Sequence, residues 1–367
     1  MKILLTGAHF TPAVAVIKEL IKYKNVQIVY VGRKTTMEGD KAESAESQIL
    51  PSMGVKFFPI ITGRLQRIFT IYTIPSLLKI PIGFIQALNI ILSEKPKVIL
   101  SFGGYVAVPV VFAGWLFSIP IIIHEQGLVS GLANKISSLF AEKKAISLKK
   151  EVFDESVILT GNPIRDEVLN PRRKIAVQYQ AIFNTAKKEK LPVVLIMGGN
   201  QGSHVINLAV EEVLNRLVKM AGVIHVTGDN KFGDYERLQG RGELSDKYLV
   251  KKWIGEEYGG VLSRVDLAIC RGGANTLTEV VYLKKPALVI PIPYLYEDEQ
   301  NKNAKYFKDL GIVRILPQSK LSGKSLMENL KFMLNNLQRI KQRANDAKKS
   351  IIPNAAKRLA LETISMI

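Results

Sequence analysis

The chain has 367 residues, of which 47% are hydrophobic and 23% charged, a composition that fits a globular protein with two domains and excludes a disordered chain. Fifty-one Lys and Arg against 32 Asp and Glu give a net charge of +19, which favours an anionic partner such as an acidic lipid surface or a phosphorylated substrate. Nucleic acid is not the expected partner, because the basic residues are dispersed and zinc-finger spacing is absent. The single cysteine, Cys270, excludes an internal disulfide and suits a reducing compartment.

The first elements predict a parallel α/β unit. Residues 1–6 form an apolar strand, Gly7-Ala8-His9 a turn, and a helix is expected from about Pro12. No secretory leader is expected, because the polar turn breaks the apolar stretch early. His9 follows a strand at its carboxyl end, where open α/β sheets bind ligands, so a functional role is favoured over a local capping role.

The second strand is predicted at 26–31, and the basic Arg33 that follows it argues against a NAD site, which prefers an acid there. Residues 35–54 are polar and are expected to form a mobile loop. Two long apolar stretches come next. Gly103-Gly104 and two prolines divide 98–123 into strand, helix and strand, whereas 68–93 is left open between core helix, membrane-docking segment and span.

Polar groups follow the next strands of this half. Gly103-Gly104-Tyr105 ends one strand, and His124-Glu125-Gln126 ends the strand at 121–123. Polar side chains at the end of an apolar strand are costly unless they face a cleft or pair with one another, and the cleft is favoured. Strands at 145–148 and 157–160 complete the half, and the turn at 161–163 predicts an interdomain hinge.

The second half repeats the scheme. A strand at 193–197 leads into a glycine turn at 198–203 and a helix, and a later strand is expected to close at Trp253-Ile254. The apolar positions expected to share the buried face of the helix are Val205, Leu208, Ala209, Val213 and Leu214.

The segment 266–303 carries the most specific pattern. A strand at 266–270 runs into a glycine pair, and a helix is expected from about Ala274, whose first N–H groups and dipole suit a phosphate. Glu279 lies one turn beyond Asn275, where its carboxylate can accept hydrogen bonds from a sugar diol. After a strand at 287–290, a polar loop offers carboxylates and the amides of Gln300 and Asn303 to a second polyol. The order predicts a nucleotide-sugar pocket.

Five segments together resemble the MurG family of bacterial N-acetylglucosaminyltransferases. These segments are Ser101-Phe102-Gly103-Gly104-Tyr105, His124-Glu125-Gln126, Thr160-Gly161-Asn162-Pro163-Ile164-Arg165, Gly198-Gly199-Asn200-Gln201-Gly202, and the stretch 266–303. They stand in family order, and the resemblance extends from residue 3 to about residue 310.

The resemblance implies two Rossmann-like α/β domains facing across a cleft, the GT-B glycosyltransferase fold. The acceptor and membrane-side domain is expected at 1–163, with a C-terminal helix at about 348–367 packing back on it, and the donor domain at 164–347. The implied reaction is inverting transfer of N-acetylglucosamine from UDP-N-acetylglucosamine to undecaprenyl-linked lipid I. It forms lipid II for peptidoglycan synthesis, cell shape and cell division. The implied location is peripheral, on the cytoplasmic side of the cell membrane, against anionic lipid.

Matching motif positions assigns the site residues. The residues assigned to the donor are Thr6, Gly7, Ala8, Arg165, Asn200, Ile254, Gly273, Ala274, Asn275, Thr276, Leu277, Thr278, Glu279, Gln300 and Asn303. The residues assigned to the acceptor are Gly103, Gly104, Tyr105 and Gln126. Within the donor set, Glu279 is assigned to the ribose, Gln300 and Asn303 to the N-acetylglucosamine, and Arg165 and Ile254 to the nucleotide.

The sequence predicts chemistry without a cofactor or a dedicated metal site, because it has neither an Asp-x-Asp pair nor a histidine or cysteine cluster. Helix starts after Gly199 and Gly273 are expected to stabilise the leaving UDP instead. His9 is the first choice for the base that deprotonates the acceptor hydroxyl, with His124 or Glu125 as alternatives. Two other functions are weighed: a UDP-sugar epimerase, and a non-catalytic, membrane-associated nucleotide-sugar-binding protein.

Overall fold

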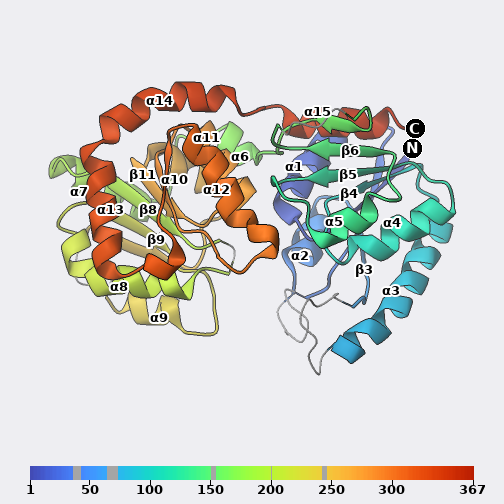
Figure 1. Cartoon of the computed structure of the whole chain (residues 1–367), viewed down its shortest axis with the longest axis horizontal. Coiled ribbons are helices and arrows are strands. Elements are labelled where there is room, and N and C mark those ends of the chain that lie inside the picture. Colours follow the sequence, from blue (N-terminus) through green and yellow to red (C-terminus); the bar gives the residue numbers. More distant parts are fainter. Residues whose placement is uncertain (36–42, 64–72, 150–153, 200, 242–245) are drawn as a thin grey trace. The chain divides into compact units, whose positions relative to one another are not determined.

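The structure is a computed structural model that describes the chain except residues 36–42, 64–72, 150–153, 200 and 242–245 (Figure 1). The chain divides into two compact units. Unit 1 comprises Met1–Arg165 together with Asn354–Ile367, and unit 2 comprises Asp166–Pro353. Each unit is an α/β fold around one parallel sheet, so the predicted pair of Rossmann-like domains is confirmed.

Unit 1 contains a seven-stranded parallel sheet in the order β3-β2-β1-β4-β5-β6-β7. Its strands are β1 (Lys2–Thr6), β2 (Gln27–Gly32), β3 (Lys56–Pro59), β4 (Val98–Ser101), β5 (Ile121–Glu125), β6 (Lys143–Ile146) and β7 (Val157–Leu159). Its helices are α1 (Phe10–Leu20), α2 (Ala45–Ser52), α3 (Thr73–Glu94), α4 (Ala107–Leu116), α5 (Leu132–Ser137) and α15 (Ala355–Ile364).

Alternate residues of β1 enter different cores, because successive side chains of a strand point to opposite faces. Ile3 and Leu5 join the cluster that α1 and α15 cover, including Leu359. Leu4 joins the cluster that α3 and α4 cover, including Val110. Both faces of the sheet are therefore buried, which accounts for the uninterrupted apolar runs of its strands.

Unit 2 contains a six-stranded parallel sheet in the order β10-β9-β8-β11-β12-β13. Its strands are β8 (Val193–Met197), β9 (Gly222–Val226), β10 (Tyr248–Lys251), β11 (Leu267–Cys270), β12 (Ala287–Val289) and β13 (Val313–Ile315). Its helices are α6 (Asp166–Leu169), α7 (Val177–Lys188), α8 (His204–Leu217), α9 (Asp234–Gln239), α10 (Tyr258–Arg264), α11 (Ala274–Tyr282), α12 (Glu299–Asp309), α13 (Gly323–Asn335) and α14 (Leu337–Lys349), with short 3-10 turns η2 (Tyr296–Asp298) and η3 (Gln318–Lys320).

The order of strands reverses between β1 and β4 in unit 1 and between β8 and β11 in unit 2. Ligands of open α/β sheets bind outside the carboxyl ends of the strands at such switch points. The turns at Gly7, Gly103, Gly199 and Gly273 follow these four strands, so the fold places each predicted glycine turn at a switch point.

The structure corrects four local predictions. Within the expected loop at 35–54, residues 45–52 form α2, whose N-cap Ser44 accepts a hydrogen bond from the Ser47 N–H at 3.2 Å. The strand expected to close at Trp253-Ile254 ends at Lys251, and Trp253 is 55% exposed. The helix expected from 348 begins at Ala355, because 348–349 belong to α14.

The fourth correction concerns the buried face of α8. Ala209, Val213 and Leu214 are buried as expected, but Val205 and Leu208 are exposed, and the other buried apolar residues are Ile206, Val210 and Leu217. The prediction grouped residues three and four apart but started one position too early, so the apolar face is rotated by one residue along the helix.

The two long apolar stretches have different outcomes. The stretch at 98–123 is strand, helix and strand, as predicted. Part of the other stretch, residues 68–72, lies outside the described residues together with the basic Arg64 and Arg67, and its remainder forms α3. Among the helices that the structure describes, none is sufficiently long and apolar to span a bilayer.

Candidate active site

In unit 1, the turns after β1 and β4 are joined through their backbones. The Ala8 N–H donates to the Gly103 carbonyl at 2.8 Å, and the Tyr30 hydroxyl donates to the Gly7 carbonyl at 2.9 Å. Thr6 is buried beneath this turn, and its hydroxyl oxygen has no hydrogen-bond partner among the residues that the structure describes. A rigid turn with an unsatisfied buried hydroxyl is a feature to be expected next to a polar ligand.

His9 follows this turn as the N-cap residue of α1, but its side chain makes no capping hydrogen bond. Burial among neighbouring groups and the positive charge of Arg33 lower the pKa of His9 to about 4. The side chain is nevertheless exposed to solvent, so water offsets part of the first effect. Both observations leave a neutral, accessible imidazole at neutral pH, the form that a general base requires.

His124 is fully buried, unlike His9. Its Nδ1 lies 3.4 Å from the donor Nε2 of Gln126, so Nδ1 accepts and Nε2 carries the proton toward the Gly161 carbonyl at 3.3 Å. The Ser147 hydroxyl lies 3.1 Å from the same Nε2. Burial lowers the pKa of His124 to about 4. The ring is thus neutral and engaged at both nitrogens, which suits a positioning role.

Glu125 and Gln126 are also buried and bonded within unit 1. Asn134 donates through its side-chain amide to a Glu125 carboxylate oxygen at 2.9 Å and to the His124 carbonyl at 3.3 Å. Gln126 donates to the Phe102 carbonyl at 3.3 Å and thereby links β5 to the turn after β4. The sequence favoured a cleft-facing position for His124-Glu125-Gln126 over pairing within the protein. The observed contacts instead favour pairing within the protein.

Asn134 was missed by the sequence analysis. It lies on the short helix α5, is buried, and its side-chain oxygen has no partner among the described residues. Its position on the buried side of a short helix could have marked it as a candidate site residue. Its contact with Glu125 could not be predicted, because that contact depends on how α5 packs on β5.

In unit 2, helix α11 begins as predicted, with Gly273 as N-cap. The Leu277 N–H donates to the Gly273 carbonyl at 3.0 Å, so residues 274–276 form the first turn of the helix, with their N–H groups at the positive end of its dipole. Such a helix start suits an anion. The side chain of Leu277 is instead in the core, and the Thr278 hydroxyl donates to the Ala274 carbonyl at 2.8 Å, so neither supplies a free group.

Glu279 faces the interior of unit 2, with only 2% of its surface exposed. Its carboxylate is therefore not a solvated surface group. A carboxylate out of bulk water forms stronger hydrogen bonds than an exposed one, provided that donors are present. Asn275, one turn before it, is only half-buried, and the pair occupies neighbouring positions on α11.

Gln300 and Asn303 lie on α12, not in the loop that was predicted. The side-chain oxygen of Gln300 accepts from the backbone N–H groups of Gly272 and Ile292, each at 3.0 Å, and the Asn303 amide donates to the Gly272 carbonyl at 3.4 Å. The positive φ angles of Glu297 and Asp298 turn the chain into the helix. Both amides therefore hold the glycine turn after β11, and the amide nitrogen of Gln300 lies beside it.

Arg271 was also missed as a site residue. Its guanidinium is buried and donates to the Ser203 hydroxyl at 2.6 Å, the Ile290 carbonyl at 3.0 Å and the Gln318 side-chain oxygen at 2.8 Å. Burial lowers the pKa of Arg271, but arginine stays cationic in proteins. The structure thus places a fixed positive charge between the starts of α8 and α11.

The remaining predicted residues lie at the carboxyl ends of strands or in connections. Ile254 is half-buried after β10, Tyr105 is half-buried before α4, and Arg165 ends unit 1. Asn200 lies outside the described residues. Cys270 is buried at the end of β11, where burial raises the pKa of its thiol to about 12 and leaves it unreactive.

No group of three or more His, Cys, Asp and Glu side chains that would hold a metal ion occurs within the described ranges. The positive groups that the structure does place at the switch point of unit 2 are Arg271 and the start of α11. This arrangement can neutralise an anion through fixed dipoles and one guanidinium.

Comparisons with known proteins agree with this geometry. Residues 6–146 match the glycosyltransferase family 28 N-terminal domain, and residues 193–359 match the glycosyltransferase family 28 C-terminal domain. A relative from Clostridium botulinum strain Langeland, named UDP-N-acetylglucosamine--N-acetylmuramyl-(pentapeptide) pyrophosphoryl-undecaprenol N-acetylglucosamine transferase, is 33% identical over 91% of each chain.

Two solved structures share the fold. One is MurG from Acinetobacter baumannii, with a TM-score of 0.71 and 24% identity over 100% of both chains. The other is a UDP-GlcNAc 2-epimerase from Neisseria meningitidis, with a TM-score of 0.64 and 15% identity over 100% of both chains. Because a transferase and an epimerase have this fold, the fold alone does not decide the reaction. The family matches and the identity to the transferase relative do decide the family: this chain belongs to glycosyltransferase family 28.

Proposed function

We propose that the protein transfers N-acetylglucosamine from UDP-N-acetylglucosamine to the undecaprenyl-linked muramyl-pentapeptide of lipid I, giving lipid II for peptidoglycan synthesis. The observation that carries the proposal is the family membership together with the start of α11 after Gly273, which suits an anion, and the buried carboxylate of Glu279 on the same helix. The same activity is named for the relative that covers nearly the whole chain.

The donor is proposed to bind unit 2. The N–H groups of residues 274–276 and the dipole of α11 hold the diphosphate, and Glu279 accepts hydrogen bonds from the ribose. By their motif positions, Ile254 of unit 2 and Arg165, the last residue of unit 1, are also assigned to the nucleotide. Gln300 contacts the sugar through its amide nitrogen, because its oxygen already holds the backbone of Gly272 and Ile292. Asn303, on the same helix, supports the glycine turn after β11, because its amide donates to the Gly272 carbonyl.

The catalytic base is proposed to be His9. It is accessible and neutral, whereas His124 is buried with both ring nitrogens bonded, and Glu125 is held by Asn134. In the proposed step, His9 removes the proton of the acceptor hydroxyl as its oxygen attacks the anomeric carbon. The bond from this carbon to the UDP oxygen breaks with inversion, and UDP leaves with the bonding electron pair.

The leaving UDP is proposed to need no metal ion. Its developing charge is met by the α11 amides and by Arg271, which is bonded to the N-cap residue of α8. Preorganised dipoles of this kind require no rearrangement during the reaction.

Unit 1 is proposed to dock on the cytoplasmic face of the cell membrane. Among the described side chains of α3, Ile74, Leu78, Ile82 and Ile85 follow one another at three- and four-residue spacing, with 47% to 69% of each side chain in solvent. Such a stripe on one helical face, on a protein with a net charge of +19, fits insertion below anionic headgroups.

The decisive test is a transfer assay with labelled UDP-N-acetylglucosamine, a lipid I analogue and EDTA. We expect label in the extracted lipid and equimolar UDP. Conversion of the donor without acceptor to an epimeric UDP-sugar would identify an epimerase instead. Donor binding without either product would identify a binding protein.

A further inference from the structure

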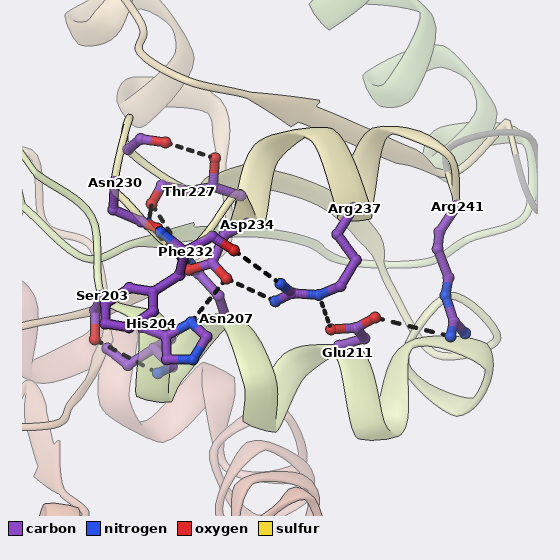
Figure 2. A network of polar contacts seen from close by, with 12 residues as sticks. Ser203, His204, Asn207, Glu211, Thr227, Asn230, Phe232, Asp234, Arg237 and Arg241 are labelled. Atoms are coloured by element: carbon purple, nitrogen blue, oxygen red, sulfur yellow. Dashed lines mark hydrogen bonds and ion pairs between the residues drawn. The ribbon is translucent and has the colours of Figure 1, made fainter.

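A buried carboxylate in unit 2 has no part in the proposed chemistry. Asp234, the first residue of α9, is 1% exposed and accepts four hydrogen bonds (Figure 2). One oxygen accepts from His204 Nδ1 at 2.8 Å and from the Arg237 guanidinium at 2.6 Å, and the other from the amides of Asn207 at 2.7 Å and Asn230 at 2.9 Å. Burial raises the pKa of Asp234, but the four hydrogen bonds outweigh it, so the pKa lies below its usual value and the group is ionised.

Two of these donors also hold a single backbone oxygen. The amide of Asn207 donates to the Thr227 carbonyl at 3.1 Å, and the amide of Asn230 donates to it at 3.5 Å. Both residues therefore connect Asp234 to the turn that follows β9. His225 extends the chain of contacts from the interior, because its Nε2 lies 3.0 Å from the Asn207 side-chain oxygen.

The Thr227 carbonyl lies directly against the glycine turn after β8. A Cβ atom on Gly202 would lie 1.6 Å from this oxygen, and a Cβ atom on Gly228 would lie 2.2 Å from the Gly202 nitrogen. Both glycines have φ near +75°, a conformation that few other residues adopt without strain. The two turns are in backbone contact, so the position of Thr227 determines where Gly202 can lie.

The other side of the same turn is held by the helix it precedes. Ser203, the N-cap of α8, accepts a hydrogen bond from Arg271. The next residue, His204, is bonded to Asp234 and stacked on Phe232 with ring centroids 4.0 Å apart (Figure 2). Asp234 thus fixes both the first turn of α8 and the carbonyl that supports Gly202. It touches the glycine turn only through these neighbours.

We infer that Asp234 is a positioning residue for the donor diphosphate: its carboxylate holds the turn after β9 against Gly202 and fixes the first turn of α8, and so keeps the N–H groups at the start of this helix in place for the diphosphate. The inference rests on the proposed function and on the expectation from the sequence that the helix start after Gly199, like the one after Gly273, stabilises the leaving UDP. Asp234 itself is not a ligand of the nucleotide.

The test compares Asp234→Asn with Glu211→Gln. In Asp234→Asn, an NH2 group replaces one of the two carboxylate oxygens and cannot accept a hydrogen bond. In one orientation of the amide the contacts with Asn207 and Asn230, which support Thr227, are lost. In the other orientation the contacts with His204 and Arg237 are lost. Glu211 is the matched control, because it accepts from Arg237 at 2.8 Å but contacts neither turn (Figure 2). Binding of UDP and of uridine is measured by calorimetry, well below the melting temperature of each variant.

We expect Asp234→Asn to weaken UDP binding about tenfold, the scale of one charge-assisted hydrogen bond, with uridine binding unchanged. Glu211→Gln should bind both ligands as the unaltered protein does. A purely structural role would lower the melting temperature and leave the ratio of UDP to uridine affinity unchanged, which would overturn the inference.

Should Asp234→Asn not fold, Asn230→Ala removes one support of Thr227 and must change the same ratio. If the unaltered protein binds no UDP, the proposed function fails, and the inference fails with it. Normal binding by both variants overturns the inference alone.

Discussion

Gln300 binds the backbone N–H of Gly272 through its side-chain oxygen at 3.0 Å, and the same oxygen binds the Ile292 N–H. One side chain on α12 thus holds the end of β11 to the connection after β12. The two halves of this amide have separable roles in our account, since the oxygen maintains the turn and the nitrogen contacts the donor sugar.

Gln300→Glu should therefore retain stability and lose donor affinity. The glutamate keeps an oxygen for both N–H groups, but it lacks the NH2 donor and adds a negative charge near the diphosphate, so the donor KM should rise about tenfold or more. Gln300→Ala should raise the KM and also destabilise unit 2 by about 1–3 kcal/mol, because two backbone donors lose their acceptor. Steady-state kinetics and thermal melts measure both. Unchanged donor kinetics in Gln300→Glu would contradict the assignment to the sugar.

His9→Gln should lower kcat by about 10²–10⁴-fold with the protein still folded, because a general base contributes on that scale. In the unaltered enzyme, kcat/KM should rise with pH through a midpoint below 6.5, since the lowered pKa of His9 keeps the ring neutral into acid. The variant should lose this limb of the profile. An acid limb that survives in His9→Gln would identify another base, and His124→Gln is the variant to compare.

Helix α3 is proposed to contact the membrane, and a charge introduced in place of one of its apolar side chains should disrupt that contact. Leu78→Glu should reduce sedimentation with anionic vesicles at least tenfold, because burial of one such side chain contributes about 1.5–3 kcal/mol. Val177→Glu alters an aliphatic side chain on α7 that is even more exposed, and it should bind as the unaltered protein does. Equal losses in both variants would point to net charge, not to the α3 stripe.

Acid should destabilise the protein through its buried histidines. Burial lowers the pKa of His124 to about 4 and that of His225 to about 3, both below the unfolded value of 6.5. Below pH 6.5 the unfolded chain binds protons that the folded chain does not. The free energy of unfolding therefore decreases as the pH is lowered, by about 2 kcal/mol per ring between pH 7 and pH 5. Urea unfolding of the protein and of His225→Gln measures this, and the variant should lose one ring's share. Identical pH dependence in the two proteins would contradict neutral burial of His225.

The sequence allowed the strands and glycine turns to be predicted because their signals are local. The run at 193–197 and the pair Gly272-Gly273 need only neighbouring residues to be interpreted. The helix α2 was missed even though Ser44 and Glu46 are helix-start residues, because the polar, glycine-containing composition of residues 35–54 favoured a loop.

Contacts between distant segments could not be predicted in this way. Arg271 and Ser203 are 68 residues apart, and Asp234 meets Asn207 from 27 residues away. Such pairs depend on which strands are neighbours and on the rotation of each helix, and a one-residue error at α8 shows how easily the latter is misjudged. Thus Glu279 and Gln300 could be named from the sequence, but the supports beneath them could not.

The central claim is that backbone amides at the start of α11 hold the UDP diphosphate. A crystal structure with UDP tests it most directly. We predict phosphate oxygens within hydrogen-bond distance of the N–H groups of residues 274–276, with the ribose at Glu279. Phosphate density remote from Gly273, or a cation bridging the two phosphates, would contradict the account.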